Sequence, residues 1–121
     1  MQKIKFIFLA TLGLGASAAL HAQQNYPQRP VRLIVTVPPG GAADLVARVM
    51  AQKLGDSLGQ TLVVDNRAGG GGQIAAETVA KAQPDGYTVL LGSITTHGIG
   101  PHMYSKLPYD PVKDFAPICL Y

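Results

Sequence analysis

A β-branched run that stops at two prolines and two glycines constrains the fold of this chain more than any other feature. Residues 31–37 (Val-Arg-Leu-Ile-Val-Thr-Val) are nearly all apolar, which is typical of a strand buried on both faces of a sheet. Residues 38–41 (Pro-Pro-Gly-Gly) end it abruptly. The chain therefore begins its ordered part with a central strand followed by a tight turn.

A helix is predicted directly after this turn, beginning around residues 42–44. Apolar side chains recur four residues apart, which predicts one broad stripe facing the core. The stripe consists of Val46, Met50 and Leu54, with Leu45 and Val49 beside them. Gly55 or Gly59 ends the helix, because glycine readily adopts the left-handed conformation of a helix C-terminus.

The same alternation of strand and helix continues along the chain. The further predicted elements are a strand over 61–65, a flexible glycine-rich loop over 67–72, a helix over 73–82 with Ile74, Thr78 and Val79 toward the core, a strand over 87–92, a loop over 93–108, a helix start at Asp110-Pro111 and a strand over 115–121. Such alternation implies parallel pairing with right-handed crossovers. We expect an α/β fold, mainly a parallel sheet flanked by helices, and truncated, because the last strand has no following element.

The first 22 residues read as an export signal. Lys3 and Lys5 precede an apolar run over residues 6–20, which is shorter than a membrane-spanning helix and exits through small residues. We place cleavage after Ala22, with a cut after Ala18 or Ala19 as the alternative and an uncut N-terminal anchor as the less favoured one. The predicted division is a signal peptide over 1–22 and a mature part over 23–121.

Charge and cysteine content exclude several classes of function. Removing residues 1–22 takes away Lys3 and Lys5 and lowers the formal net charge from +3 to +1. The remaining charges alternate in sign and form no basic run, so we expect no nucleic-acid partner. The single Cys119 excludes an internal disulfide or a zinc site of several thiolates. It lies in an apolar segment, and we expect it to be a buried structural thiol.

The turn at residues 38–41 is the sharpest candidate for a binding site. In open α/β sheets ligands sit at the carboxyl ends of the strands, and a helix N-terminus there favours an anion. Pro39, Gly40 and Gly41 would let a ligand approach the backbone closely. The alternative is an ordinary tight turn, with Asp44 stabilising the first helical turn and pairing with Arg48.

Two further loops follow strands of the same predicted sheet. Residues 70–75 (Gly-Gly-Gly-Gln-Ile-Ala) match a dinucleotide fingerprint only weakly, since the expected acidic residue about 20 positions on is absent. Ser93, Thr95 and Thr96 carry hydroxyls that can donate to a carboxylate, and the alternative for them is a solvated loop. His97 and His102 lack a third ligand, so we expect no metal. Neither histidine has an evident Asp or Glu partner and Ser93 lies in no nucleophile-elbow sequence, so we expect no catalytic group. We also expect no cofactor.

Short motifs occur in unbroken order over residues 26–121. They are Tyr26-Pro27-x-Arg29-Pro30, Pro39-Gly40-Gly41-x-x-Asp44, Val63-Val64-Asp65-Asn66-Arg67, Pro84-Asp85-Gly86-Tyr87-Thr88 and Leu107-Pro108-Tyr109-Asp110-Pro111. Together they resemble the Bug-type extracytoplasmic solute receptors, the substrate-binding components of tripartite tricarboxylate transporters. Ala68 stands where the family commonly has proline, and Gly100-Pro101 where it often has Asn-Pro.

The resemblance implies a periplasmic protein of two lobes, each like a type 2 periplasmic binding protein lobe, of which residues 23–121 are part of the first. Such a receptor captures a small organic carboxylate without catalysis, docks transiently to membrane transporter subunits and is a monomer when full length. Mapped here, the ligand-binding residues are Pro39, Gly40, Gly41 and Asp44, with Ser93, Thr95 and Thr96 as second contributors.

Two other classes of function remain open from the residues alone. One is a secreted α/β enzyme whose catalytic residues lie beyond residue 121, and the other is a protein-docking module. The coding sequence after Tyr121 would test the first class, and dye binding and urea unfolding of residues 23–121 would test the second.

Overall fold

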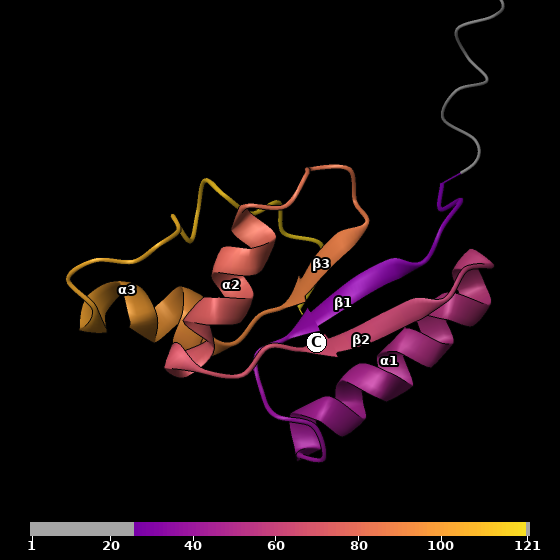
Figure 1. The fold of residues 1–121 in the computed structure, drawn as a ribbon, viewed down its shortest axis with the longest axis horizontal. Coiled ribbons are helices and arrows are strands. Elements are labelled where there is room, and N and C mark those ends of the chain that lie inside the picture. The colour runs from indigo at the N-terminus through magenta and orange to yellow at the C-terminus, as the bar shows by residue number, and fades with distance from the viewer. Residues whose placement is uncertain (1–25, 121) are drawn as a thin grey trace, which may run out of the picture.

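The computed structural model describes residues 26–120 as three strands with helices packed against them (Figure 1). The predicted signal peptide, with its cleavage site after Ala22, lies outside the described residues. Among the residues described, no helix has the length and apolar character needed to cross a membrane.

The sheet is parallel and has the strand order β2-β1-β3. Its strands are β1 (Val31–Val35), β2 (Leu62–Asn66) and β3 (Thr88–Leu91). Val35 at the end of β1 is in register with Asn66 on one side and Leu91 on the other. The predicted parallel pairing is confirmed, and all three strands end at the same edge of the sheet.

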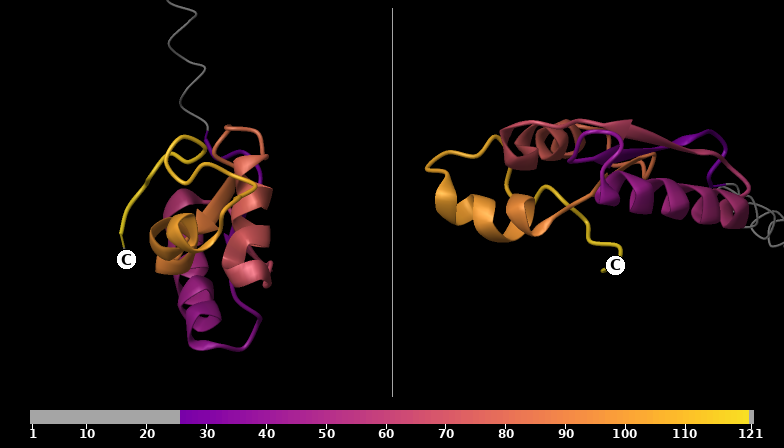
Figure 2. Two further views of the ribbon diagram at one scale, coloured as in Figure 1. Left: turned by 90° about the vertical axis from the view of Figure 1, so that its left-hand side faces the viewer. Right: turned by 90° about the horizontal axis from the view of Figure 1, so that it is seen from below.

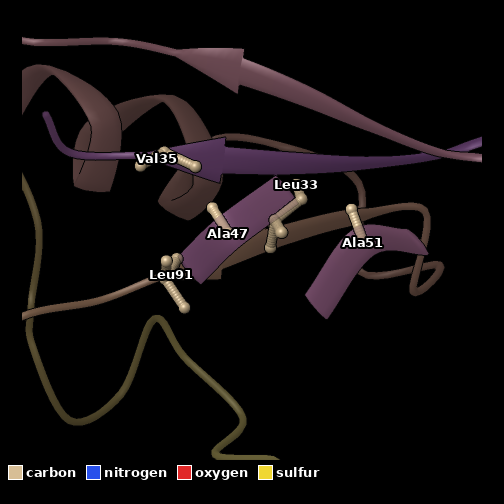
Figure 3. Close-up of a cluster of buried hydrophobic side chains, with 5 residues drawn as sticks. All are labelled: Leu33, Val35, Ala47, Ala51 and Leu91. Atoms are coloured by element: carbon tan, nitrogen blue, oxygen red, sulfur yellow. The ribbon is translucent and has the colours of Figure 1, made fainter. Parts of the chain in front are cut away.

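Helix α1 (Ala42–Leu58) covers one face of the sheet and ends at Gly59, which has a φ of 68°. Its buried contacts come from Ala47 and Ala51, which pack with Leu33, Val35 and Leu91 (Figure 3).

The predicted apolar stripe on α1 is correct at Met50, which packs against the core cluster, and wrong at its other members. Leu45, Val49 and Leu54 are 65%, 53% and 43% exposed, whereas Ala47 and Ala51 are almost fully buried. Small side chains at the contact allow the helix to lie close to the strands, which the spacing of large residues alone did not reveal.

Helix α2 (Gln73–Ala80) lies on the opposite face of the sheet (Figure 2), as right-handed crossovers on either side of a central strand require. Ala75, Ala76 and Ile34 are fully buried. Because side chains alternate along β1, Ile34 faces away from the cluster of Leu33 and Val35. The prediction that Ile74 faces the core is wrong, since it is 48% exposed.

Residues 26–30, the lead-in segment before β1, fix the end of the sheet at which the strands begin. The hydroxyl of Tyr26 donates to the Gly86 carbonyl over 2.6 Å, and Arg29 pairs with Asp85 at 2.8 Å. The Arg29 guanidinium also lies 4.2 Å from the centre of the Tyr87 ring. These contacts give two of the sequence motifs a structural role, because they hold the lead-in against the turn before β3.

The segment after β3 departs from the prediction in two places. The expected loop over 93–108 contains a π-helical turn, η3 (Thr95–Ile99), and a short helix, α3 (Gly100–Met103). Pro101 at the start of α3 suits a first helical turn, where its missing N–H costs nothing.

The predicted elements after residue 109 are also corrected. Asp110 accepts the N–H groups of Val112 and Lys113, as a helix cap does, but only a turn follows. Residues 115–120 form no strand within the described chain, and Leu120 is fully exposed. Cys119 is exposed rather than buried. A strand requires a neighbour for its backbone groups, and Pro117 removes one donor from this segment.

Candidate functional site

Three loops meet at the edge of the sheet where the strands end (Figure 1). They follow β1, β2 and β3 and comprise residues 36–41, 67–72 and 92–96. Two of them lead into the N-termini of α1 and α2. All three loops therefore lie at one edge of the sheet.

The first loop exposes its backbone at the N-terminus of α1. Gly40 has a φ of +92°, which favours glycine, and Gly41 caps the helix in an extended conformation. A Cβ atom at either position would meet no other atom within 4 Å, and Pro39 beside them is also exposed. Gly41 supplies no side-chain cap, so the N–H groups of the first helical turn remain directed out of the helix end. This arrangement can receive an anion.

Asp44 lies buried beneath this loop and has partners on both carboxylate oxygens. Its Oδ2 accepts the N–H of Gly40 and the Nε–H of Arg48, each over 2.9 Å. Its Oδ1 accepts from Nδ2 of Asn66, also over 2.9 Å. These bonds, that from Arg48 foremost, lower the pKa of Asp44 to about 2. The predicted pairing with Arg48 is confirmed, and the carboxylate also holds the loop in place.

The second loop is shaped by four consecutive glycines that all have positive φ. Residues Gly70–Gly72 form a 3-10 turn, within which Gly71 has a non-helical φ of 63°. A Cβ atom on Gly72 would lie 2.7 Å from Cγ2 of Thr96 and 3.2 Å from Cβ of Thr36. Glycine is therefore required where this loop packs between the other two.

The third loop divides its three predicted residues between two environments. Thr96 is fully buried, and its Oγ1 accepts the N–H of Ser93 over 3.0 Å and lies 2.8 Å from Nδ1 of His97. Ser93 and Thr95 are half-buried at the edge of the sheet. Loss of solvation around the imidazole lowers the pKa of His97. Within residues 26–120 no group of three His, Cys, Asp or Glu side chains could hold a metal ion.

Two contributors to this edge were missed by the sequence analysis. Asn66 is the last residue of β2, and its side chain reaches both Asp44 and the carbonyl of Val37. Tyr109 is buried and donates its hydroxyl to the Thr96 carbonyl over 2.8 Å. The position of Asn66 at the carboxyl end of a predicted strand was a usable signal, whereas the packing of Tyr109 depends on the fold.

Comparison with known proteins places this geometry among transport receptors. The family model described as "Tripartite tricarboxylate transporter family receptor" matches residues 46–120. Protein BugT of Bordetella pertussis is 44% identical over 115 residues, which are 94% of this chain and 34% of the relative.

Solved structures agree with this match. The periplasmic binding protein BugD has a TM-score of 0.73 and 43% identity, covering 77% of this chain and 31% of its own. MatC from Rhodopseudomonas palustris, with bound malate, has a TM-score of 0.72 and 41% identity, covering 76% of this chain and 31% of its own. This chain thus spans about a third of the length of the proteins it matches.

Proposed function

Because this chain belongs to the tripartite tricarboxylate transporter receptor family, we propose that it contributes to the capture of a small organic carboxylate in the periplasm. The observation that carries the proposal is the open backbone of Gly40 and Gly41 at the N-terminus of α1. Exposed N–H groups and the positive end of the helix dipole stabilise a carboxylate at such a place. The malate bound to MatC supports the same class of ligand.

Each predicted site residue has a separate part in this proposal. Pro39, Gly40 and Gly41 form the surface that a carboxylate approaches, and the hydroxyls of Ser93 and Thr95 donate from the neighbouring loop. Asp44 and Thr96 act from below, since both are buried and already hydrogen-bonded. The capture makes and breaks no covalent bond.

The rest of the pocket is proposed to come from a second lobe. Residues 23–121 would form part of the first lobe, because the matched relatives are about three times as long as the aligned segment. The complete receptor would act as a monomer and dock transiently to membrane transporter subunits. Sequencing the gene beyond the Tyr121 codon tests the division, and a stop codon there would contradict it.

Isothermal titration of the complete mature protein against malate, succinate, adipate, citrate and benzoate tests the function. We expect saturable one-to-one binding of at least one acid. The matched control is the amide of the acid that binds, which lacks the negative charge and should bind far more weakly. Absence of binding to every acid would overturn the proposal, as would equal binding of the amide.

A further inference from the structure

The side-chain amide of Asn66 joins the end of β2 to both ends of the exposed turn after β1. Its Nδ2 donates to the Val37 carbonyl over 3.0 Å and to Oδ1 of Asp44 over 2.9 Å. Its Oδ1 lies 3.5 Å from Nη2 of Arg48. One half-buried amide therefore contacts the start of the turn and the first two turns of α1.

The turn itself has few other restraints. At its far end the Gly40 N–H is held by Asp44, which is in turn held by Asn66. Between Val37 and Gly40 lie Pro38 and Pro39, which have no N–H to donate to the rest of the fold. The position of the exposed backbone thus depends on a relay that begins at Asn66.

The same hydrogen bonds also fix the position of the Asp44 carboxylate charge. Asp44 is an ionised carboxylate directly beneath the place proposed to receive another carboxylate, and two such groups repel. Asn66 donates to Oδ1 of Asp44 and Arg48 donates to Oδ2. These hydrogen bonds stabilise the Asp44 charge and hold the carboxylate against β2 and α1.

We propose that Asn66 is a positioning residue for ligand binding, which sets the Pro39–Gly41 backbone and holds the Asp44 charge away from the bound anion. This inference rests on the function proposed above. It predicts that Asn66 controls affinity although it does not touch the ligand.

The test compares Asn66→Ala, Asn66→Asp and the matched control Gln52→Ala in the complete mature protein. Gln52 is an exposed amide on α1, away from the exposed turn. Titration with the acid that the unmodified protein binds should give affinity weaker by roughly tenfold or more for Asn66→Ala and unchanged for Gln52→Ala.

The Asn66→Asp variant separates positioning from a general loss of structure. Its new carboxylate would lie about 3 Å from that of Asp44, so the pair shares a proton and one of the two pKa values rises. Arg48 is the cation that faces this pair. Affinity should be low at pH 8 and should recover in part toward pH 5, because the introduced carboxyl group, once protonated, has one O–H that can again donate to Asp44 but cannot also donate to the Val37 carbonyl. The unmodified protein lacks this recovery.

The outcomes are distinct. If the unmodified protein binds no acid, the proposed function fails, whereas binding that is equal in the unmodified protein and both Asn66 variants overturns the positioning role alone. An Asn66→Asp affinity that follows the same pH dependence as the unmodified protein also overturns it. A thermal melt accompanies each variant, and unfolding of both at 25 °C would contradict the inference, which requires a folded protein with a displaced turn.

Discussion

Asp44 is the residue whose charge state is most closely tied to the shape of the exposed turn. Its three hydrogen bonds, to Arg48, Gly40 and Asn66, all favour the ionised carboxylate. They lower its pKa from the usual 3.8 to about 2. A carboxyl group that ionises more readily in the folded state stabilises that state when it is ionised.

The free energy of unfolding should therefore fall at acid pH as Asp44 becomes protonated. The contribution is fully present above about pH 4 and is lost as the pH falls from 4 to 2, through the folded pKa. Urea unfolding of the unmodified protein and of Asp44→Asn should show a gap in unfolding free energy at pH 6 that narrows over this window. If the difference in unfolding free energy between the two proteins stayed constant from pH 6 to pH 2, the stabilising role of the ionised Asp44 would be contradicted.

Gly72 tests the packing between the loops. Its φ of +90° and the 2.7 Å approach to Thr96 leave no room for a side chain. We expect Gly72→Ala to lower the unfolding free energy by about 2 kcal/mol or more. Gly41→Ser is the matched control, because that position has open space and an extended backbone, and serine is a favourable helix N-cap. Equal stabilities of the two variants in urea would contradict the packing described.

At the scale of elements, the hydrophobic pattern located strands and helices but not the buried face of a helix. The run over 31–37 and its Pro-Gly stop correctly indicated a strand buried on both faces, and alternation correctly indicated parallel order. On α1 the spacing of large residues indicated a core face through Val46, Met50 and Leu54, yet Ala47 and Ala51 are the buried residues and Met50 alone of that stripe packs against them. Alanine is apolar and small, so its role depends on how closely the helix approaches the sheet.

The candidate site was also predictable only in part. The location of the turn after β1, at the carboxyl end of a strand, followed from general rules about α/β sheets, and its glycines are exposed there; its role as a ligand site stays a prediction. Asn66 was missed because its contacts span 22 and 29 residues of sequence. The strand expected over 115–121 does not form over its described residues 115–120, because pairing depends on a neighbouring strand rather than on local composition.

The contact between α1 and the sheet predicts how substitutions on the two sides of this helix change the unfolding free energy. Ala47→Leu would insert three extra carbon atoms against Leu33 and Val35, and should cost roughly 1–3 kcal/mol of unfolding free energy. Val49→Ala, on the exposed side of the same helix, should change it by less than about 0.5 kcal/mol. Chemical denaturation of the pair checks this, and the reverse order of effects would show that the helix faces the sheet differently.

At the scale of the whole molecule, this chain is an α/β unit with the proposed binding edge on one side and large apolar side chains left exposed on others. Leu45 and Met103 are 65% and 68% exposed. The matched relatives are much longer than this chain, and the proposed second lobe would supply the missing walls of the pocket. Capture between two lobes agrees with a turn that presents backbone groups to open space.

Amide NMR during a titration with the carboxylate that binds tests the central claim most directly. We predict that saturation of the complete mature protein shifts the backbone amide signals of Gly41, Ala42 and Ala43 most strongly, with smaller shifts at Ser93 and Thr95. These are the groups to which the proposed function assigns the anion. Saturable binding that leaves the amides of both loops unshifted would contradict the account.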